Sequence, residues 1–273
     1  MTNPPLVLFG AGRMGAALCE GWIQGTLDRS LIVVEPSPSG RLETLASEGV
    51  IALNPTAAPA GILAICVKPQ IFPRVLQDIR PWVGPETLIL SIMAGVKLRQ
   101  LSERLGASRV VRAMPNTPGA IGRGVSLLAV SAEVSKSEVA LARSLLEPLG
   151  AVEGPMVEDQ LSIATALSGC GPAYLFLLAE VLADAGKAAG LAPSVADRIS
   201  EATITGSAAL LETSDDAPSI LRKAVTSPNG VTQAALDVLM GEQGLPSLMK
   251  KAVDAAILRD EALSAVLDEE SEP

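Results

Sequence analysis

The stretch "LVLFGAGRMGAALCEGW" (residues 6–22) decides the fold. Four apolar residues typical of a buried strand lead into a glycine-rich turn, and an amphipathic helical pattern follows over residues 14–24. Gly10 permits the tight turn, Gly12 lets a pyrophosphate approach the backbone, and Gly15 allows the helix to pack closely on the strand. Because free N–H groups and the positive helix end attract negative charge, we expect this loop to bind a dinucleotide through Gly10, Ala11, Gly12, Arg13, Met14 and Gly15.

An acidic residue closes the next strand-like run. Glu35 ends "LIVVE" and lies where a carboxylate can accept hydrogen bonds from the ribose hydroxyls of the nucleotide. A carboxylate there repels the extra phosphate of NADP, so the sequence favours NADH. The alternatives stay open that Glu35 is a solvated strand end, or that Ser37, Ser39 and Arg41 surround that phosphate if Glu35 turns away. The predicted cofactor is therefore NADH or NADPH, with Glu35 favouring NADH.

The chain changes its pattern near Val157. Before that point, β-branched runs alternate with helical patterns, as in a largely parallel sheet covered by helices on both faces; the runs are 6–9, 31–34, 62–67, 88–92, 110–114 and 125–130. After it, long Ala/Leu segments follow one another over 173–189, 193–213, 217–224, 231–241 and 245–266. We therefore predict an α/β fold with a Rossmann-type dinucleotide-binding domain (1–157), an all-helical domain (158–267) and an acidic disordered tail (268–273).

Composition narrows the function classes. A net charge of −9 argues against nucleic acid or an anionic membrane as a partner. The absence of histidine excludes Ser-His-Asp and Cys-His catalysis and every His-ligated metal site, so we predict no metal. Cys19, Cys66 and Cys170 lie far apart in apolar contexts, which is typical of free thiols in a cytosolic protein. No basic region precedes an apolar run at the N-terminus, so we expect a cytoplasmic location without a signal peptide.

Residues 161–179, "LSIATALSGCGPAYLFLLA", carry no charge over a length close to that of a membrane span. The segment 169–172, Gly-Cys-Gly-Pro, would break a helix in its middle, and Glu180 and Asp184 follow directly. We therefore expect this stretch to be buried in a core or a subunit interface, with no membrane partner.

Later strand ends carry small or polar residues at the edge of the sheet where ligands bind in such folds. "CVKPQ" places Lys68 at the end of its strand, followed by Pro69. "SIMAG" (91–95) ends in small residues that allow close passage of a cofactor, and "RAMPNTP" offers Asn116 and Thr117 between two prolines. Together these strand ends are interpreted as one wall of the cofactor site.

These motifs carry a family resemblance. "FGAGRMG", "VKPQ", "SIMAGV", "RAMPNTP", "LSGCGPAYLFLLAEVLADAG" and "AVTSPNGVTQAAL" occur in the order found in pyrroline-5-carboxylate reductases, and the resemblance runs from Leu6 to Leu263. It implies reduction of the cyclic imine pyrroline-5-carboxylate to proline with NADPH or NADH, the last step of proline synthesis. It also implies a Rossmann domain and a helical domain that interlocks with a partner subunit in a homodimer, which often assembles further into a decamer.

The resemblance assigns residue roles by position. It implies that the nucleotide site also includes Asn54, Val67, Lys68, Pro69, Met93 and Ala94. It implies a substrate site made of Glu158, Ser227, Gly230, Val231 and Thr232. We expect backbone N–H groups of residues 230–232 and the Ser227 hydroxyl to hold the substrate carboxylate. We expect the Thr232 hydroxyl to act catalytically by hydrogen-bonding the ring nitrogen.

Four positions depart from the family pattern, and they keep other functions open. Asn229 and Val231 replace common family residues in the 227–232 loop, Ala224 replaces a polar residue, and Cys170 replaces a serine. Ala224 and Asn229 could suit a reductase of a six-membered or substituted cyclic imine with the same architecture. A β-hydroxyacid dehydrogenase would need a lysine early in the first long helix of the helical domain. Here that helix, over residues 173–189, has no lysine before Lys187. A non-enzymatic NAD-binding protein is the third alternative.

Overall fold

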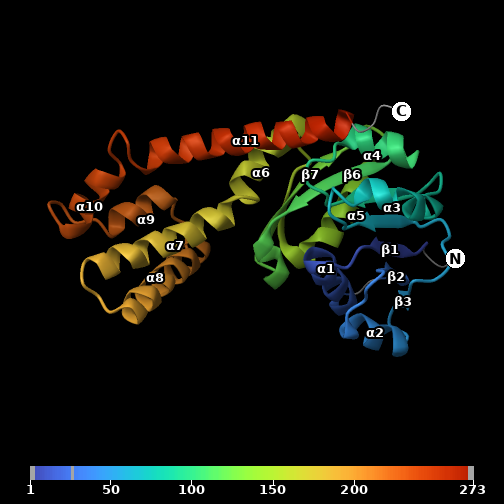
Figure 1. Ribbon diagram of the computed structural model, residues 1–273, viewed down its shortest axis with the longest axis horizontal. Helices are drawn as coiled ribbons and strands as arrows, with labels where there is room; N and C mark the ends of the chain where they lie inside the picture. The colour runs from blue at the N-terminus through green and yellow to red at the C-terminus, as the bar shows by residue number, and fades with distance from the viewer. Residues whose placement is uncertain (1–3, 26–27, 270–273) are drawn as a thin grey trace. The chain divides into compact units, whose positions relative to one another are not determined.

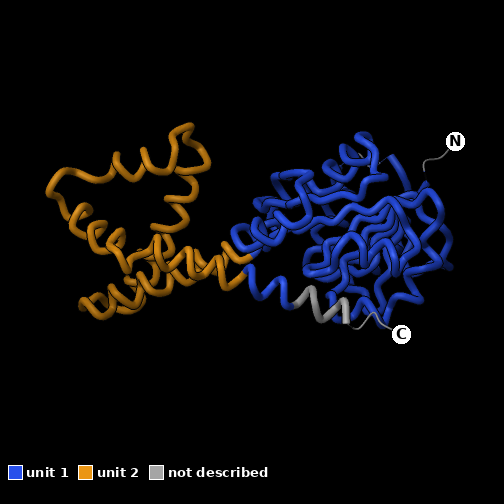
Figure 2. Tube along the Cα trace, turned by 90° about the horizontal axis from the view of Figure 1, so that it is seen from above, with its two compact units in different colours: residues 1–169, 257–273 blue, residues 170–256 orange. Residues whose placement is uncertain are grey.

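The computed structural model describes residues 4–25 and 28–269, with side chains described as far as residue 262. The chain forms two compact units, shown in Figure 2. The first comprises Met1–Gly169 together with Ile257–Pro273, and the second comprises Cys170–Ala256.

The first unit contains an eight-stranded sheet with the order β3-β2-β1-β4-β5-β6-β7-β8. Neighbouring strands run parallel except β6 and β7, which pair antiparallel. The strand order reverses direction between β1 and β4, which is where dinucleotides bind in open α/β sheets. The strands are β1 (Leu6–Phe9), β2 (Leu31–Val34), β3 (Ala52–Leu53), β4 (Ile62–Ile65), β5 (Leu88–Ser91), β6 (Val110–Pro115), β7 (Gly124–Val130) and β8 (Gly150–Glu153).

Helices cover both faces of this sheet (Figure 1). Leu6 and Leu8 of β1 face a core that also holds Leu18 of α1, while Val7 and Phe9 face a second core on the other side. Burial on both faces explains why the strands are continuous apolar runs. The helices and 3-10 turns of this unit are α1 (Arg13–Gln24), α2 (Gly40–Ser47), α3 (Phe72–Ile79), η1 (Arg80–Trp82), α4 (Leu98–Leu105), η2 (Thr117–Ile121), α5 (Lys136–Leu146), η3 (Glu147–Leu149), α6 (Glu158–Ser168) and the last part of α11 (Leu245–Glu269).

The predicted fold class is confirmed, and the structure adds two strands to it. The sequence patterns did not indicate β3, which has two residues, or β8, whose sequence "GAVE" has one buried side chain, Val152. The antiparallel direction of β7 was not predicted either, because the apolar run of a buried strand does not encode its direction.

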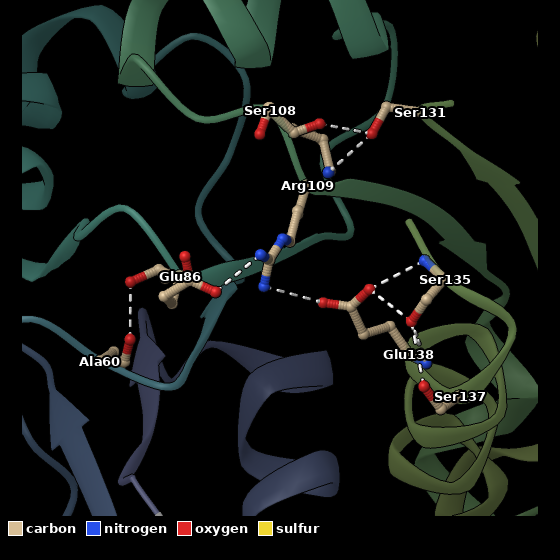
Figure 3. A network of polar contacts seen from close by, with 10 residues as sticks. Ala60, Glu86, Ser108, Arg109, Ser131, Ser135, Ser137 and Glu138 are labelled. Atoms are coloured by element: carbon tan, nitrogen blue, oxygen red, sulfur yellow. Dashed lines mark hydrogen bonds and ion pairs between the residues drawn. The ribbon is translucent and has the colours of Figure 1, made fainter. Parts of the chain in front are cut away.

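Arg109, directly before β6, links the segment before β5 to α5 at the end of the sheet where these two strands begin (Figure 3). Its guanidinium donates to Glu86 at 2.6 Å and to Glu138, in the first turn of α5, at 3.4 Å. Glu138 Oε2 also accepts from the Ser135 N–H at 2.8 Å and from the Ser135 hydroxyl at 2.7 Å. Although burial opposes ionisation, the hydrogen bonds from Ser135 and the charge of Arg109 lower the pKa of Glu138 below its usual value.

The second unit is helical throughout its regular structure, as predicted from the Ala/Leu segments. Its helices are α7 (Gly171–Ala188), α8 (Pro193–Thr213), α9 (Pro218–Ala224), α10 (Val231–Leu239) and the first part of α11 (Leu245–Glu269). α7 and α8 pack together: the Ser200 hydroxyl donates to the Ala179 carbonyl. Lys187 bridges Asp184 at 3.1 Å and Asp197 at 2.8 Å.

The two compact units divide the chain at a different place from the change of pattern near Val157. α6 packs against the sheet, with Leu161 buried beside Leu127, so this helix belongs to the first unit. The Ser162 hydroxyl of α6 donates to Asp260 Oδ2 of α11 at 2.6 Å, within the same unit. Of the tail predicted over 268–273, the first two residues end α11 and residues 270–273 lie outside the described residues.

Residues 158–188 are, among the described residues, the one helical stretch long and apolar enough to cross a bilayer by length and composition. The stretch is interrupted at residues 169–170, between α6 and α7. Only 11% of its most apolar 18-residue segment is buried within the chain. Its exposed apolar side chains are Ile163, Leu167, Leu175, Phe176, Leu177, Leu178, Val181 and Leu182. This surface calls for a covering partner.

Candidate active site

The loop between β1 and α1 has the geometry of a phosphate cradle. Gly10 has φ +92°, and a Cβ there would lie 2.9 Å from Val67 Cγ1. A Cβ at Gly15 would lie 2.3 Å from the Gly10 carbonyl oxygen, so helix and strand meet too closely for a side chain. A Cβ at Gly12 would meet no described atom within 4 Å, and Gly12 provides no side-chain cap for α1. The first N–H groups of α1 and the open side of Gly12 therefore fit a pyrophosphate.

Glu35 is fixed beside this cradle. Its Oε2 accepts from the Ala11 N–H at 2.8 Å, and its Oε1 accepts from the Ser37 N–H at 3.1 Å. Asn54, which has φ +49°, accepts from the Glu35 N–H through Oδ1 and donates to the Glu35 carbonyl through Nδ2, both at 2.9 Å. The structure thus brings together the glycine loop, Glu35 and Asn54, three parts of the predicted nucleotide site.

The residues predicted as an alternative phosphate site are largely engaged elsewhere. The Ser39 hydroxyl accepts from the Leu42 N–H at 3.4 Å and caps α2. Arg41 forms a two-point ion pair with Glu20 of α1: Nε lies 2.8 Å from Oε1, and a terminal nitrogen lies 3.2 Å from Oε2. This pairing raises the pKa of Arg41 and lowers that of Glu20. Glu20 was not among the residues that the sequence indicated.

The ends of β4 and β5 follow β1 at the same edge of the sheet. Val67 lies beside the glycine loop, since its Cγ1 would be 2.9 Å from a Cβ at Gly10, and Lys68, at the following position, is exposed. Ala94 is exposed, whereas the Met93 side chain is buried in the core, so only its backbone is available to a nucleotide. The remaining position of this set, Pro69, is half-buried directly after Lys68.

Asn116 and Cys66 have structural roles in this chain. The Asn116 amide donates to the Ser168 carbonyl at 3.0 Å and accepts from the Val125 N–H at 2.9 Å, so both of its ends are used. Cys66 lies against Gly15, and burial raises the pKa of its thiol, which keeps it protonated and makes it a packing residue. Thr117 begins η2 and is exposed.

Glu158 pairs with the buried guanidinium of Arg112. It begins α6, and its Oε1 accepts from Arg112 at 2.9 Å and from the Leu98 N–H at 2.8 Å. Arg112, on β6, is 4% exposed, and its pairing with Glu158 compensates for burial of the guanidinium. The sequence indicated Glu158 as a substrate ligand and did not indicate Arg112, because the two are 46 positions apart.

The 226–232 loop lies in the second unit and leads into α10. Asn229 has φ +58°, a conformation that asparagine tolerates better than most residues. The Gly230 N–H donates to the Ser227 carbonyl at 3.0 Å, which corrects the expectation that this N–H is free for a carboxylate. Because Val231 and Thr232 lie in the first turn of α10, their N–H groups have no acceptor within the helix. Both residues are exposed.

Comparison with known proteins places this geometry in a family. The chain is 36% identical to "Pyrroline-5-carboxylate reductase" of Pseudomonas aeruginosa over 272 residues, which cover 98% of this chain and 99% of that protein. The chain belongs to the pyrroline-5-carboxylate reductase family. A pea pyrroline-5-carboxylate reductase (Pisum sativum) is 33% identical over 95% of this chain and 96% of its own.

Solved reductase structures share the fold. A pyrroline-5-carboxylate reductase from Coxiella burnetii superposes with a TM-score of 0.86 at 31% identity, over 97% of this chain and 99% of its own. The Plasmodium falciparum pyrroline carboxylate reductase, whose structure has NADP bound, superposes with a TM-score of 0.77 at 28% identity, over 97% of this chain and 99% of its own. In this chain, residues 5–95 match the sequence profile described as "NADP oxidoreductase coenzyme F420-dependent". The glycine loop, Glu35 and Asn54 all lie within that match.

The helical half of this reductase matches a profile described as "Pyrroline-5-carboxylate reductase dimerisation" over residues 158–263. The match includes α6 and α7, which carry the exposed apolar side chains. Homo-oligomerisation is thus a property of this domain family, and the subunit-interface interpretation of residues 161–179 agrees with it.

Proposed function

We propose that this chain reduces the C=N bond of pyrroline-5-carboxylate with NAD(P)H and yields L-proline, the last step of proline biosynthesis. The observation that carries the proposal is the match to curated reductases along nearly the whole chain, which includes both the nucleotide cradle and the 226–232 loop. Reduction of a related cyclic imine, six-membered or substituted, is the second candidate. It is supported by Ala224 and Asn229, where the loop region departs from the family pattern.

The proposed roles follow the chemistry of a small anionic imine. The N–H groups of Val231 and Thr232 and the Ser227 hydroxyl hold the substrate carboxylate at the positive start of α10. The Thr232 hydroxyl hydrogen-bonds the ring nitrogen. The bound dinucleotide supplies the hydride that adds to the imine carbon. Since the substrate binds as the protonated iminium, this addition gives a neutral amine, and orientation replaces acid catalysis by a histidine.

The cofactor proposal is NADH in preference to NADPH. The Glu35 carboxylate lies between the Ala11 and Ser37 N–H groups, at the end of β2 where the adenosine ribose binds in this fold. A negative charge at this position repels a ribose phosphate and accepts hydrogen bonds from ribose hydroxyls.

The proposed assembly is a homodimer built through the helical unit, which can associate further into a decamer. The proposed setting is soluble and cytoplasmic, since an oligomer covers the apolar faces of α6 and α7 without a membrane.

The test follows oxidation of NADH and of NADPH with pyrroline-5-carboxylate and with its six-membered analogue. The proposal predicts faster turnover with the five-membered imine and with NADH. Faster turnover of the six-membered ring would favour the second candidate, and no oxidation with either imine would contradict both.

Thr232 variants test the catalytic role. Thr232→Ala should lower turnover about 10–100-fold, or about 1–3 kcal/mol on the transition state, because the ring nitrogen loses a hydrogen bond. Thr232→Ser keeps the hydroxyl and serves as the control. Equal turnover of Thr232→Ala and the unmodified chain would remove Thr232 from the mechanism.

A further inference from the structure

Glu20 lies outside the predicted nucleotide site and forms an ion pair with Arg41. It lies in the second turn of α1, the helix that begins at the glycine loop. Its carboxylate receives both Arg41 contacts, at 2.8 and 3.2 Å, from the first turn of α2. α1 and α2 lie next to each other on the same side of the sheet (Figure 1).

Arg41 is the cation that a ribose phosphate would otherwise meet. It is the first cationic residue after Glu35, and the chain between them is only five residues long. In this fold, an arginine after β2 accommodates the 2′-phosphate of NADP, and a two-point guanidinium contact is the usual mode. In this chain the same two-point contact is made with a carboxylate, so a phosphate has to displace Glu20 or share the guanidinium with it.

We propose that Glu20 is a specificity-determining residue, which disfavours NADPH by holding Arg41 in an ion pair and by repelling a phosphate that approaches it. Glu20 acts through Arg41 and is a positioning residue. The inference deepens the cofactor part of the proposed function and rests on it. The effect is modest because the Arg41 and Glu20 side chains are 56% and 35% exposed, and water screens such pairs.

The experiment measures binding of two adenosine fragments to the purified full chain by calorimetry at low salt. Adenosine 2′,5′-bisphosphate carries the ribose phosphate, and 5′-AMP lacks it. Glu20→Gln should tighten binding of the bisphosphate about 3–10-fold and change that of 5′-AMP by less than about twofold. A general effect on stability would move both fragments together.

Two variants serve as controls. Glu48→Gln removes the same charge from the end of α2, where Glu48 acts on Arg41 through space without an ion pair. It should give a smaller gain than Glu20→Gln. In the double variant Glu20→Gln/Arg41→Gln the gain should disappear, because the phosphate has lost its cation.

The inference is overturned if Glu20→Gln behaves like Glu48→Gln, or if its gain persists without Arg41. If neither fragment nor NADH binds the unmodified chain, the dinucleotide site itself fails, which is a failure of the proposed function. Binding of both fragments with no response to Glu20→Gln removes only the role of Glu20.

Discussion

Replacing Glu158 by alanine should destabilise the first unit. The change leaves the guanidinium of Arg112, which is 4% exposed, without its carboxylate, and it removes the acceptor of the Leu98 N–H. Breaking a buried ion pair from one side costs about 3–5 kcal/mol. Because 24% of the Glu158 side chain is exposed, water can partly solvate the remaining charge, and we expect a loss of about 2–3 kcal/mol.

Thermal unfolding followed by circular dichroism measures this loss. At about 2–4 °C per kcal/mol for a unit of this size, the melting temperature should fall by roughly 4–12 °C. Glu153→Ala, at an exposed position of β8, is a matched control that should leave the melting temperature within about 1 °C. In Glu158→Ala/Arg112→Met no charge stays buried, so most of the stability should return.

This series separates two roles for Glu158. The sequence assigned it to the substrate by family position, whereas its contacts in the structure are to Arg112 and Leu98. A melting temperature unchanged by Glu158→Ala, together with a raised KM for the imine, would refute the structural reasoning and favour the substrate role.

Two further predictions concern the glycine loop and the Arg109 network. Gly15→Ala forces a Cβ to 2.3 Å from the Gly10 carbonyl oxygen, so it should cost about 1–3 kcal/mol of stability. Gly12→Ala meets no such clash, so it should keep the melting temperature but weaken NADH binding in a fluorescence titration. Full NADH binding by Gly12→Ala would argue against the cradle. The Glu138 pKa is lowered in the folded chain, so its contribution to stability is present above its usual pKa of 4.5 and is lost as the pH falls through the lowered value. Urea unfolding at several pH values should therefore show Glu138→Gln less stable than the unmodified chain at pH 7 and the difference shrinking below pH 4.5; a difference independent of pH would contradict the assignment.

Much of the first unit was predictable because the conformation of its glycine loop and the position of Glu35 depend on residues close together in sequence. The turn at Gly10 and the close approach at Gly15 follow from glycine spacing, and Glu35 follows from its place at the end of β2. Ser39, which caps α2, and Ser135, which caps α5, are local signals of the same kind that the sequence analysis did not use. In these cases a few neighbouring residues determine the conformation.

Contacts between distant positions were not predictable from one sequence. The Arg112–Glu158 pair spans 46 positions and the Glu20–Arg41 pair spans 21, and neither has a sequence signature. The use of the Gly230 N–H in its own turn depends on the positive φ of Asn229, which the residue type permits without requiring it. The roles of Ser227 and Thr232 came from family resemblance rather than from the loop itself.

The most direct test of the central claim is to follow the hydride. The purified chain is incubated with pyrroline-5-carboxylate and NADH deuterated at both C4 positions, and the product is analysed by mass spectrometry. The proposed function predicts one proline for each NADH oxidised, with one deuterium on the former imine carbon. NADH oxidation without labelled proline, or no oxidation at all, would contradict it.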